Sequence, residues 1–355
     1  MAAAAPQRGR PPPATRPAHP VGPGPRAGAP HDGHLRLGAD AAARRRRARA
    51  GPAASLVARR TAGAVTAPVA AVVTAFRPDE RATAVVRSAA AQCATVVVVD
   101  NTPEGEPGTD ALPEVAALAT VLRPGRNLGL AGALNAGAAS VPPGTDLLLL
   151  DQDSAVPDGL VAALAAHLDD DPRTGVAAPV PWDVDADRPL DPRAAHRPPL
   201  ADLPVVITSG MLVRRAALDA VGPFREDFFV DCVDQDFCLR VRHAGWRVVQ
   251  DARVRLPHSL GETRWRGIGP LRLRSTSHAT WRLYWTARNG TVLAREHLRR
   301  EPAWVIVSAA LQCYVALTVL LFEPPRAQRL ATLLRGLRDG WTGRTDPRMR
   351  PGGPA

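Results

Sequence analysis

The sequence predicts an α/β protein with a mostly parallel central sheet and a helical C-terminal extension. From Val69 onward, short apolar runs alternate with helix-like segments, and strands that alternate with helices in this way form right-handed βαβ units. The run Leu147–Leu150 stops at Asp151 and Asp153, and four apolar residues in a row are typical of a buried strand. The stretch 303–322 carries no charged side chain, which sets the C-terminal part apart.

The elements are predicted in chain order from periodicity and from the residues that punctuate it. Apolar, mostly β-branched runs favour strands, and the loop 127–132 opens a helix. The expected strands are 69–74, 96–99, 120–122, 147–150, 175–180, 205–209, 211–214, 246–250 and 254–256. The expected helices are 81–92, 112–119, 133–139, 159–168, 216–221 and 237–244. The polar, Pro-rich stretch 182–201 is predicted to be a loop over the site.

Composition separates a basic arm from a nearly neutral core. The 355 residues carry a formal charge of +11, of which residues 1–60 hold +10 through twelve Arg and two Asp. We therefore expect 1–66 to be a disordered Pro/Ala/Arg-rich arm, and we expect no specific nucleic-acid partner for the globular part. All 45 basic residues are Arg, a compositional bias that makes any single Arg less informative.

The four cysteines have neither metal-finger nor redox spacing. Together with an N-terminus that lacks an apolar signal core, they favour a reducing, cytoplasmic location.

The C-terminal extension, expected at 263–345 with a disordered tail at 346–355, raises the question of a membrane. The uncharged stretch 303–322 just reaches the length of a membrane span. After it, apolar residues recur at helical spacing between Arg residues, namely Leu330, Leu333, Leu334, Leu337 and Trp341. This pattern favours an interfacial amphipathic helix at the inner face of the cell membrane. A true span and a helix pair packed on the catalytic core are the alternatives.

Asp151 and Asp153 are the first candidate site residues. Side chains at i and i+2 of an extended segment point the same way, and ligands of open α/β sheets bind beyond the carboxyl ends of the strands. Two carboxylates with no thiolate or imidazole beside them suit a hard divalent ion, Mg²⁺ or Mn²⁺, that also holds a diphosphate. Two solvated Asp residues in a turn are the simpler interpretation.

A second acidic cluster lies at 231–236. Asp234 and Asp236 come at the start of a predicted helix, where one carboxylate can act as the cap. We assign capping to Asp236, which leaves Asp234 pointing toward the sheet edge as a general base would. Asp100 ends the second strand, where it can accept the imide N–H of a uracil or thymine ring or simply shape a turn. His258 follows the last strand and is a candidate metal or diphosphate ligand.

These pieces, in this order, resemble the inverting family 2 glycosyltransferases of the GT-A fold, and among them the bacterial rhamnosyltransferase branch. The matching stretches are Val-Thr-Ala-Phe-Arg-Pro at 73–78, Val-Val-Asp-Asn at 98–101, Asn-Leu-Gly-Leu-Ala-Gly-Ala-Leu-Asn at 127–135, Leu-Asp-Gln-Asp-Ser at 150–154, Ser-Gly-Met-Leu at 209–212, Gly-Pro-Phe at 222–224, Phe-Val-Asp at 229–231 through Arg240, His-Ser-Leu-Gly at 258–261 and Tyr-Trp-Thr-Ala-Arg-Asn at 284–289. The resemblance covers roughly 70–340 and implies a GT-A nucleotide-sugar-binding domain at 67–262.

The resemblance also implies a reaction and a set of roles. The donor would be dTDP-β-L-rhamnose, the acceptor a glycan or lipid-linked glycan, and the product α-linked, with a divalent ion assisting. Asp234 would be the catalytic base, and Asp153 and His258 would bind the metal. The donor-binding candidates are Thr74, Asp100, Arg126, Asn127, Asp151 and Asp153. The acceptor-side candidates are Ser209, Gly210 and Asp231.

The chain departs from the family pattern at two positions. The common Glu-Asp pair appears as Val233-Asp234, and the tyrosine common early in the first loop is Phe76, which cannot donate a hydroxyl hydrogen bond to the nucleotide.

Three other functions would require different features of the chain. A family member that uses another donor, such as a UDP-hexose, stays open. A sugar nucleotidyltransferase would carry a Gly-rich loop with a Lys, and this chain has no Lys. A non-catalytic membrane or nucleic-acid adaptor acting through the Arg-rich arm would not need the ordered acidic clusters.

Overall fold

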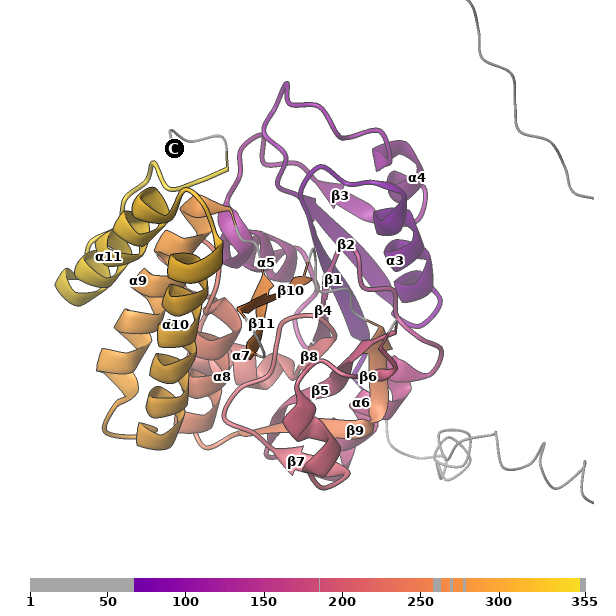
Figure 1. Cartoon of the computed structure of the whole chain (residues 1–355). Coiled ribbons are helices and arrows are strands. Elements are labelled where there is room, and N and C mark those ends of the chain that lie inside the picture. Colours follow the sequence, from indigo (N-terminus) through magenta and orange to yellow (C-terminus); the bar gives the residue numbers. More distant parts are fainter. Residues whose placement is uncertain (1–66, 185, 258–262, 269–270, 277–278, 352–355) are drawn as a thin grey trace, which may run out of the picture. The chain divides into compact units, whose positions relative to one another are not determined.

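The computed structural model describes residues 67–184, 186–257, 263–268, 271–276 and 279–351, with the backbone alone at 263–276. The arm expected at 1–66 lies outside these residues. The described part of the chain consists of a large mixed sheet, helices on both of its faces, and a group of three helices formed by the C-terminal segment (Figure 1).

The sheet has nine strands in the order β3-β2-β1-β4-β8-β5-β9-β7, with β6 paired to β5. The first group is β1 (Val69–Ala75), β2 (Thr95–Asp100), β3 (Thr120–Leu122) and β4 (Asp146–Asp151), all parallel. The second group is β5 (Thr174–Asp183), β6 (Arg188–Pro189), β7 (Leu200–Asp202), β8 (Met211–Val213) and β9 (Arg247–Pro257). Only β6, β7 and β8 run against the common direction, so the mostly parallel sheet is confirmed.

Both faces of the sheet are buried, which explains its continuous apolar runs. The helices that cover it are α3 (Glu80–Ala90), α4 (Leu112–Ala116), α5 (Gly129–Ala139), α6 (Leu160–Asp170), α7 (Arg215–Val221) and α8 (Val233–His243). Along β4 the leucines alternate between two cores. Leu149 packs in the core that contains Leu134 of α5 and Phe237 of α8, and Leu148 packs in the core that contains Leu164 of α6.

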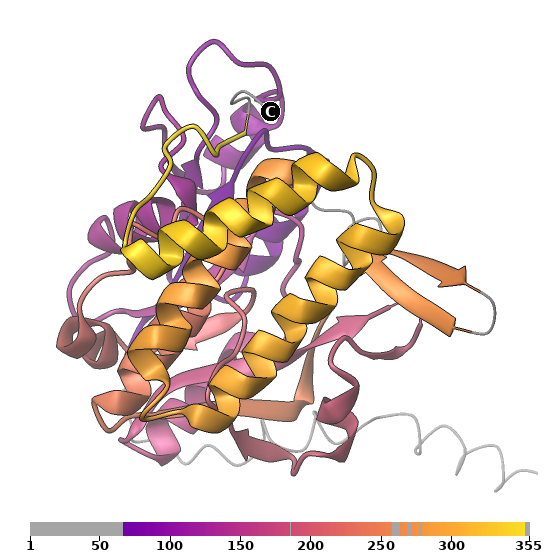
Figure 2. The same cartoon turned by 60° about the vertical axis from the view of Figure 1, so that its left-hand side comes forward.

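The C-terminal segment begins as an antiparallel hairpin, β10 (Thr263–Ile268) with β11 (Leu271–Thr276). It is therefore not helical from residue 263 as expected. Three helices follow, α9 (Thr280–His297), α10 (Pro302–Phe322) and α11 (Arg326–Thr342), and they pack on one another (Figure 2). Gly336 and Gly340 of α11 permit the close approach to α9, because an added Cβ would lie 2.5 Å from the Tyr284 carbonyl and 2.4 Å from the Arg288 carbonyl respectively.

Four sequence predictions are corrected. Residues 205–209 form no strand, and the two strands expected at 246–250 and 254–256 are one irregular strand, β9. The stretch 182–201 contains β6, a 3₁₀ turn at Pro192–His196 and part of β7, and it lines a separate hollow beside Trp182 and Arg255. Residues 346–351 belong to the packed structure instead of a disordered tail, since the Tyr284 hydroxyl accepts from the Asp346 N–H at 2.8 Å.

Candidate active site

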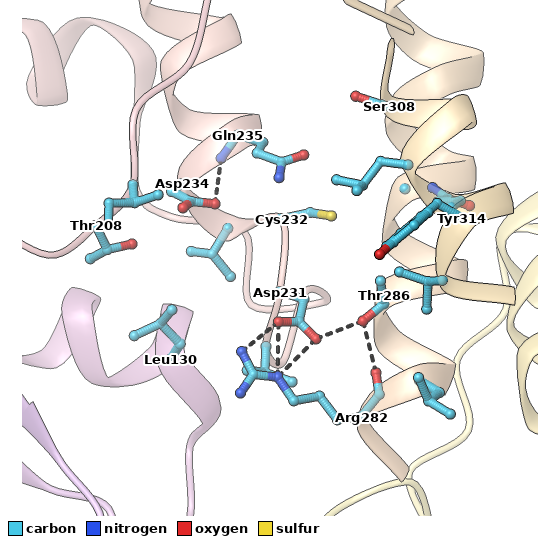
Figure 3. A pocket seen from close by; sticks show the side chains of 18 of the residues that line it. Leu130, Thr208, Asp231, Cys232, Asp234, Gln235, Arg282, Thr286, Ser308 and Tyr314 are labelled. Atoms are coloured by element: carbon cyan, nitrogen blue, oxygen red, sulfur yellow. Dashed lines mark hydrogen bonds and ion pairs between the residues drawn. The ribbon is translucent and has the colours of Figure 1, made fainter. Parts of the chain in front are cut away.

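A cavity of about 680 Å³ lies where the end of β4, the start of α8 and the C-terminal helices meet. Figure 3 shows side chains from these elements turned toward the same space. The sheet side contributes Asp151 and Ser209, and the α8 side contributes Asp231 and Asp234. Arg282 and Thr286 come from α9, and α10 forms the opposite wall with Ser308, Gln312 and Tyr314 among others. Four of the residues predicted from sequence are thus brought together.

The segment before α8 is held in an unusual backbone conformation. Asp231 and Cys232 both have positive φ, 60° and 63°, a region that residues other than Gly rarely adopt. Two hydrogen bonds fix this turn, from the Asn289 amide to the Val230 carbonyl (2.9 Å) and to the Asp231 carbonyl (3.0 Å). A buried side chain of α9 therefore sets the direction in which α8 starts.

The other side of this segment is held by α5. The Leu130 N–H donates to the Phe229 carbonyl at 2.7 Å. Gly129, at φ +76°, makes that approach possible, because a Cβ at this position would lie 2.4 Å from the same carbonyl oxygen. The Gly in the Asn-Leu-Gly stretch thus positions the acidic cluster as well as opening its own helix.

Asp231 is bound by Arg282 and Thr286. The guanidinium Nε and Nη2 of Arg282 lie 3.0 and 2.7 Å from Oδ1 of Asp231, and the Thr286 hydroxyl donates to Oδ2 at 2.9 Å. Both carboxylate oxygens are therefore engaged, and Asp231 is poorly placed to take a proton from a substrate.

Asp234 lies in the first turn of α8. Its Oδ1 accepts a hydrogen bond from the Gln235 N–H at 2.8 Å. Burial raises the pKa of Asp234 to about 6, the Gln235 hydrogen bond opposes this rise, and the charges of Asp231 and Asp151 add to it. A carboxylate with a pKa near 6 is ionised at neutral pH and still binds a proton more strongly than an ordinary Asp.

Asp236 is not the helix cap that the sequence predicted. The N-cap position is Cys232, and the Asp236 side chain is buried and paired with Arg240 at 2.7 Å and Arg225 at 3.5 Å. The helix starts four residues earlier than expected, which places Asp236 one turn inside it and facing these guanidinium groups.

The donor-side candidates follow the carboxyl edge of the parallel strands. Asp151 is in register with Thr74 of β1, and Asp100 of β2 is in register with Ala75, so Asp100 lies one position further along the same edge of the sheet. Asp151 accepts a hydrogen bond from the Ser209 hydroxyl. Asp100 is buried, accepts from the Thr102 N–H at 3.0 Å, and lies 3.3 Å from the Arg123 guanidinium.

Other predicted residues are not among those that line the cavity. Asp153 is 3.8 Å from Arg81 of α3, and Asn127 accepts from the Gly129 N–H at 2.8 Å, which shapes the start of α5. Arg126 is exposed, and Gly210 follows Ser209 at φ +77°. Neither these four nor Thr74 and Asp100 line the cavity as described. His258 lies outside the described residues.

Sequence reasoning missed Arg282 and Thr286. These residues and Asn289 recur at i, i+4 and i+7 on α9 and so share a helix face, which was the available signal. The uniform use of Arg in this chain hid it.

One group of possible metal ligands lies elsewhere among the described residues. Ligand atoms of Asp236, Glu296 and His297 lie within 4.8 Å of one another. Arg240 already pairs with Asp236, and Arg225 lies 2.7 Å from Glu296, so the carboxylates there are neutralised without a metal ion.

Comparison with known proteins agrees with this geometry. Residues 71–222 match the family model described as Glycosyl transferase family 2. The chain is 25% identical over 250 residues to the dTDP-rhamnosyl transferase RfbF of Shigella flexneri, across 64% of this chain and 80% of that protein.

Solved structures give the fold. The mannosyltransferase PcManGT from Pyrobaculum calidifontis, in complex with GDP-Man and Mn²⁺, superposes with a TM-score of 0.52 at 19% identity, covering 83% of this chain and 82% of that one. A further match is to GalNAc-T7 with UDP, GalNAc and Mn²⁺, with a TM-score of 0.45 and 16% identity, covering 55% of this chain and 44% of that one. The described part of the chain has the GT-A glycosyltransferase fold. Its residues 71–222 form a family 2 glycosyltransferase domain.

Proposed function

We propose that this glycosyltransferase moves L-rhamnose from dTDP-L-rhamnose to a hydroxyl of a glycan or lipid-linked glycan, with inversion at the anomeric carbon. The observation that carries the proposal is Asp234, a carboxylate at the cavity whose pKa is raised to about 6. The rhamnosyl donor is supported by the likeness to RfbF, and we place the enzyme in the cytoplasm at the inner face of the cell membrane.

The proposed reaction is a single displacement. The acceptor hydroxyl gives its proton to the Asp234 carboxylate while its oxygen attacks C1 of the sugar. The bond between C1 and the diphosphate oxygen breaks at the same time, and dTDP leaves with the electron pair. Asp231 holds Arg282 at the cavity, where the guanidinium offsets part of the negative charge around the base.

We assign the donor side to the carboxyl edge of the sheet, at the ends of β1, β2 and β4. Asp100 accepts the imide N–H of thymine, Thr74 and Asp151 lie under the ribose and diphosphate, and Arg126 and Asn127 border the same loop. Ser209, Gly210 and Asp231 face the acceptor.

A divalent ion, Mg²⁺ or Mn²⁺, fits the chemistry of the ligands, because carboxylate oxygens at Asp151 and Asp153 are what hard cations bind. When bound, the ion neutralises charge on the departing diphosphate. Asp153, with His258 as a second candidate, would hold it.

A donor panel tests the proposal. The full-length protein is incubated with dTDP-L-rhamnose, UDP-glucose or GDP-mannose in the presence of Mg²⁺ or Mn²⁺, and release of the nucleoside diphosphate is measured. We expect dTDP-L-rhamnose to be consumed fastest. Preferential consumption of another donor would overturn the rhamnosyl assignment and leave the family assignment intact.

A further inference from the structure

The outer side of the C-terminal helices is an exposed apolar surface. On α10 the exposed large side chains are Ile306 (67%), Val307 (50%), Leu311 (60%), Leu317 (45%) and Leu320 (49%). The helix contains no charged residue, and only 17% of its most apolar 18-residue stretch is buried. A soluble protein rarely leaves such a continuous apolar stripe uncovered.

The neighbouring helix extends this surface. Leu334, Leu337 and Trp341 of α11 recur at helical spacing and are 58%, 40% and 67% exposed. In Figure 2, α10 and α11 lie at the front of the molecule, contact each other near the loop that joins them, and diverge away from it. We call these exposed residues of the two helices the α10–α11 face.

Positive charge borders the α10–α11 face. Arg299 and Arg300 precede α10, with Glu301 between them and the helix, and Arg326 follows the loop after α10; all three Arg residues are exposed. An apolar stripe flanked by Arg complements a bilayer with anionic head groups, because the side chains enter the acyl boundary while the guanidinium groups stay at the phosphates.

We propose that the α10–α11 face docks in the plane of an anionic lipid bilayer, with α10 lying in the interface. The other side of α10 argues against a span in this fold. It packs on α9 and contributes Ser308, Gln312 and Tyr314 to the cavity that contains Asp234 and the Asp231–Arg282 pair. A spanning α10 would carry these polar groups into hydrocarbon, where charged groups are strongly disfavoured.

The docking places the catalytic cavity at the membrane. Leu311 lines the cavity and is 60% exposed, so the cavity borders the apolar surface. The docking proposal rests on the proposed function and adds to it the face of the protein that meets the membrane. The vesicle test contains no nucleotide sugar, so failure of the docking proposal is distinguishable from failure of the rhamnosyl assignment.

The experiment is co-sedimentation of the full-length protein with vesicles of phosphatidylcholine, with and without phosphatidylglycerol. The test variant is Leu317→Asp with Leu320→Asp, and the matched control is Leu118→Asp, a leucine of similar exposure (41%) near α4. We expect the test variant to bind vesicles at least about tenfold more weakly, since Asp is far costlier than Leu near hydrocarbon. The control should bind like the wild type.

Charge and topology are tested with the same vesicles. Arg299→Gln with Arg300→Gln should weaken binding several-fold at low salt, and salt should weaken wild-type binding. Unchanged binding of the Leu317/Leu320 variant, or no wild-type binding, overturns the proposal. Release only by detergent would mean a span. A dimer in light scattering that the leucine variant dissociates, without change in vesicle binding, would mean that this face joins two copies of the chain.

Discussion

Replacing Asp234 by Asn separates its role in catalysis from its effect on stability. Asn keeps the size of the side chain. It also keeps an oxygen that can accept from the Gln235 N–H, which lies 2.8 Å from Oδ1 in the wild type. It cannot take up a proton at neutral pH. We therefore expect turnover to fall by roughly 100- to 10,000-fold, the usual range for loss of a general base, with dTDP affinity retained.

The same substitution should make the protein more stable at pH 7. The pKa of Asp234 is raised from 3.8 to about 6, and each pKa unit corresponds to 1.36 kcal/mol. Ionisation in the folded state therefore costs up to roughly 3 kcal/mol relative to the unfolded chain, and about 1–2 kcal/mol after allowing for solvent in the cavity. Because the folded-state pKa is the higher one, the stability that protonated Asp234 contributes to the folded state is fully present below about pH 4. It is lost as the pH rises through about 6.

Urea unfolding and turnover are measured on the same preparations, with Asp231→Asn as the control. The control leaves the Arg282 guanidinium without its carboxylate, so it should lower the free energy of unfolding by about 1–3 kcal/mol. Wild-type turnover should rise with pH through about 6 as Asp234 loses its proton. If Asp234→Asn turns over like the wild type while Asp231→Asn does not, the base is Asp231 and the reasoning fails.

Three further predictions address the metal ion, the N-terminal arm and the contact of Gly129 with the segment before α8. Asp153→Ala should abolish metal-dependent donor binding in calorimetry without lowering the melting temperature, and full wild-type activity in EDTA would end the metal role. Deleting residues 1–60 should leave the melting temperature nearly unchanged; a fall of many degrees would show that the arm packs on the core. Gly129→Ala should destabilise by about 3 kcal/mol or more in urea, because its Cβ would meet the Phe229 carbonyl oxygen at 2.4 Å. Gly144→Ala, at φ +75° in open space, should cost only about 1 kcal/mol, and equal losses would refute the packing argument.

The sequence predicted the residues that end parallel strands. Strands of one direction finish at one edge of the sheet, so candidates that end strands lie at that edge: Asp151 is in register with Thr74, and Asp100 is in register with the next residue, Ala75. Asp234 could be placed near that edge because a helix follows it. These inferences use only local periodicity and strand direction, which a sequence displays directly.

Contacts between distant segments could not be predicted in this way. Asp236 looked like a cap because the helix was expected to start at 237; it starts at Val233, after the turn at 231–232, whose positive φ values no local pattern indicates. Arg282 reaches Asp231 across 51 residues. The role of α10 as a wall of the cavity depends on how three helices pack together, so composition showed its apolar character but not its position.

The anomeric configuration of the first rhamnose released from dTDP-β-L-rhamnose tests the central claim most directly. Without an acceptor, water can take the place of the acceptor hydroxyl beside Asp234, and proton NMR at early times distinguishes the two anomers. A displacement with inversion, assisted by Asp234, predicts α-L-rhamnose first, at a rate that Asp234→Asn lowers by at least about 100-fold. Release of β-L-rhamnose first, or an unchanged rate in Asp234→Asn, would contradict it.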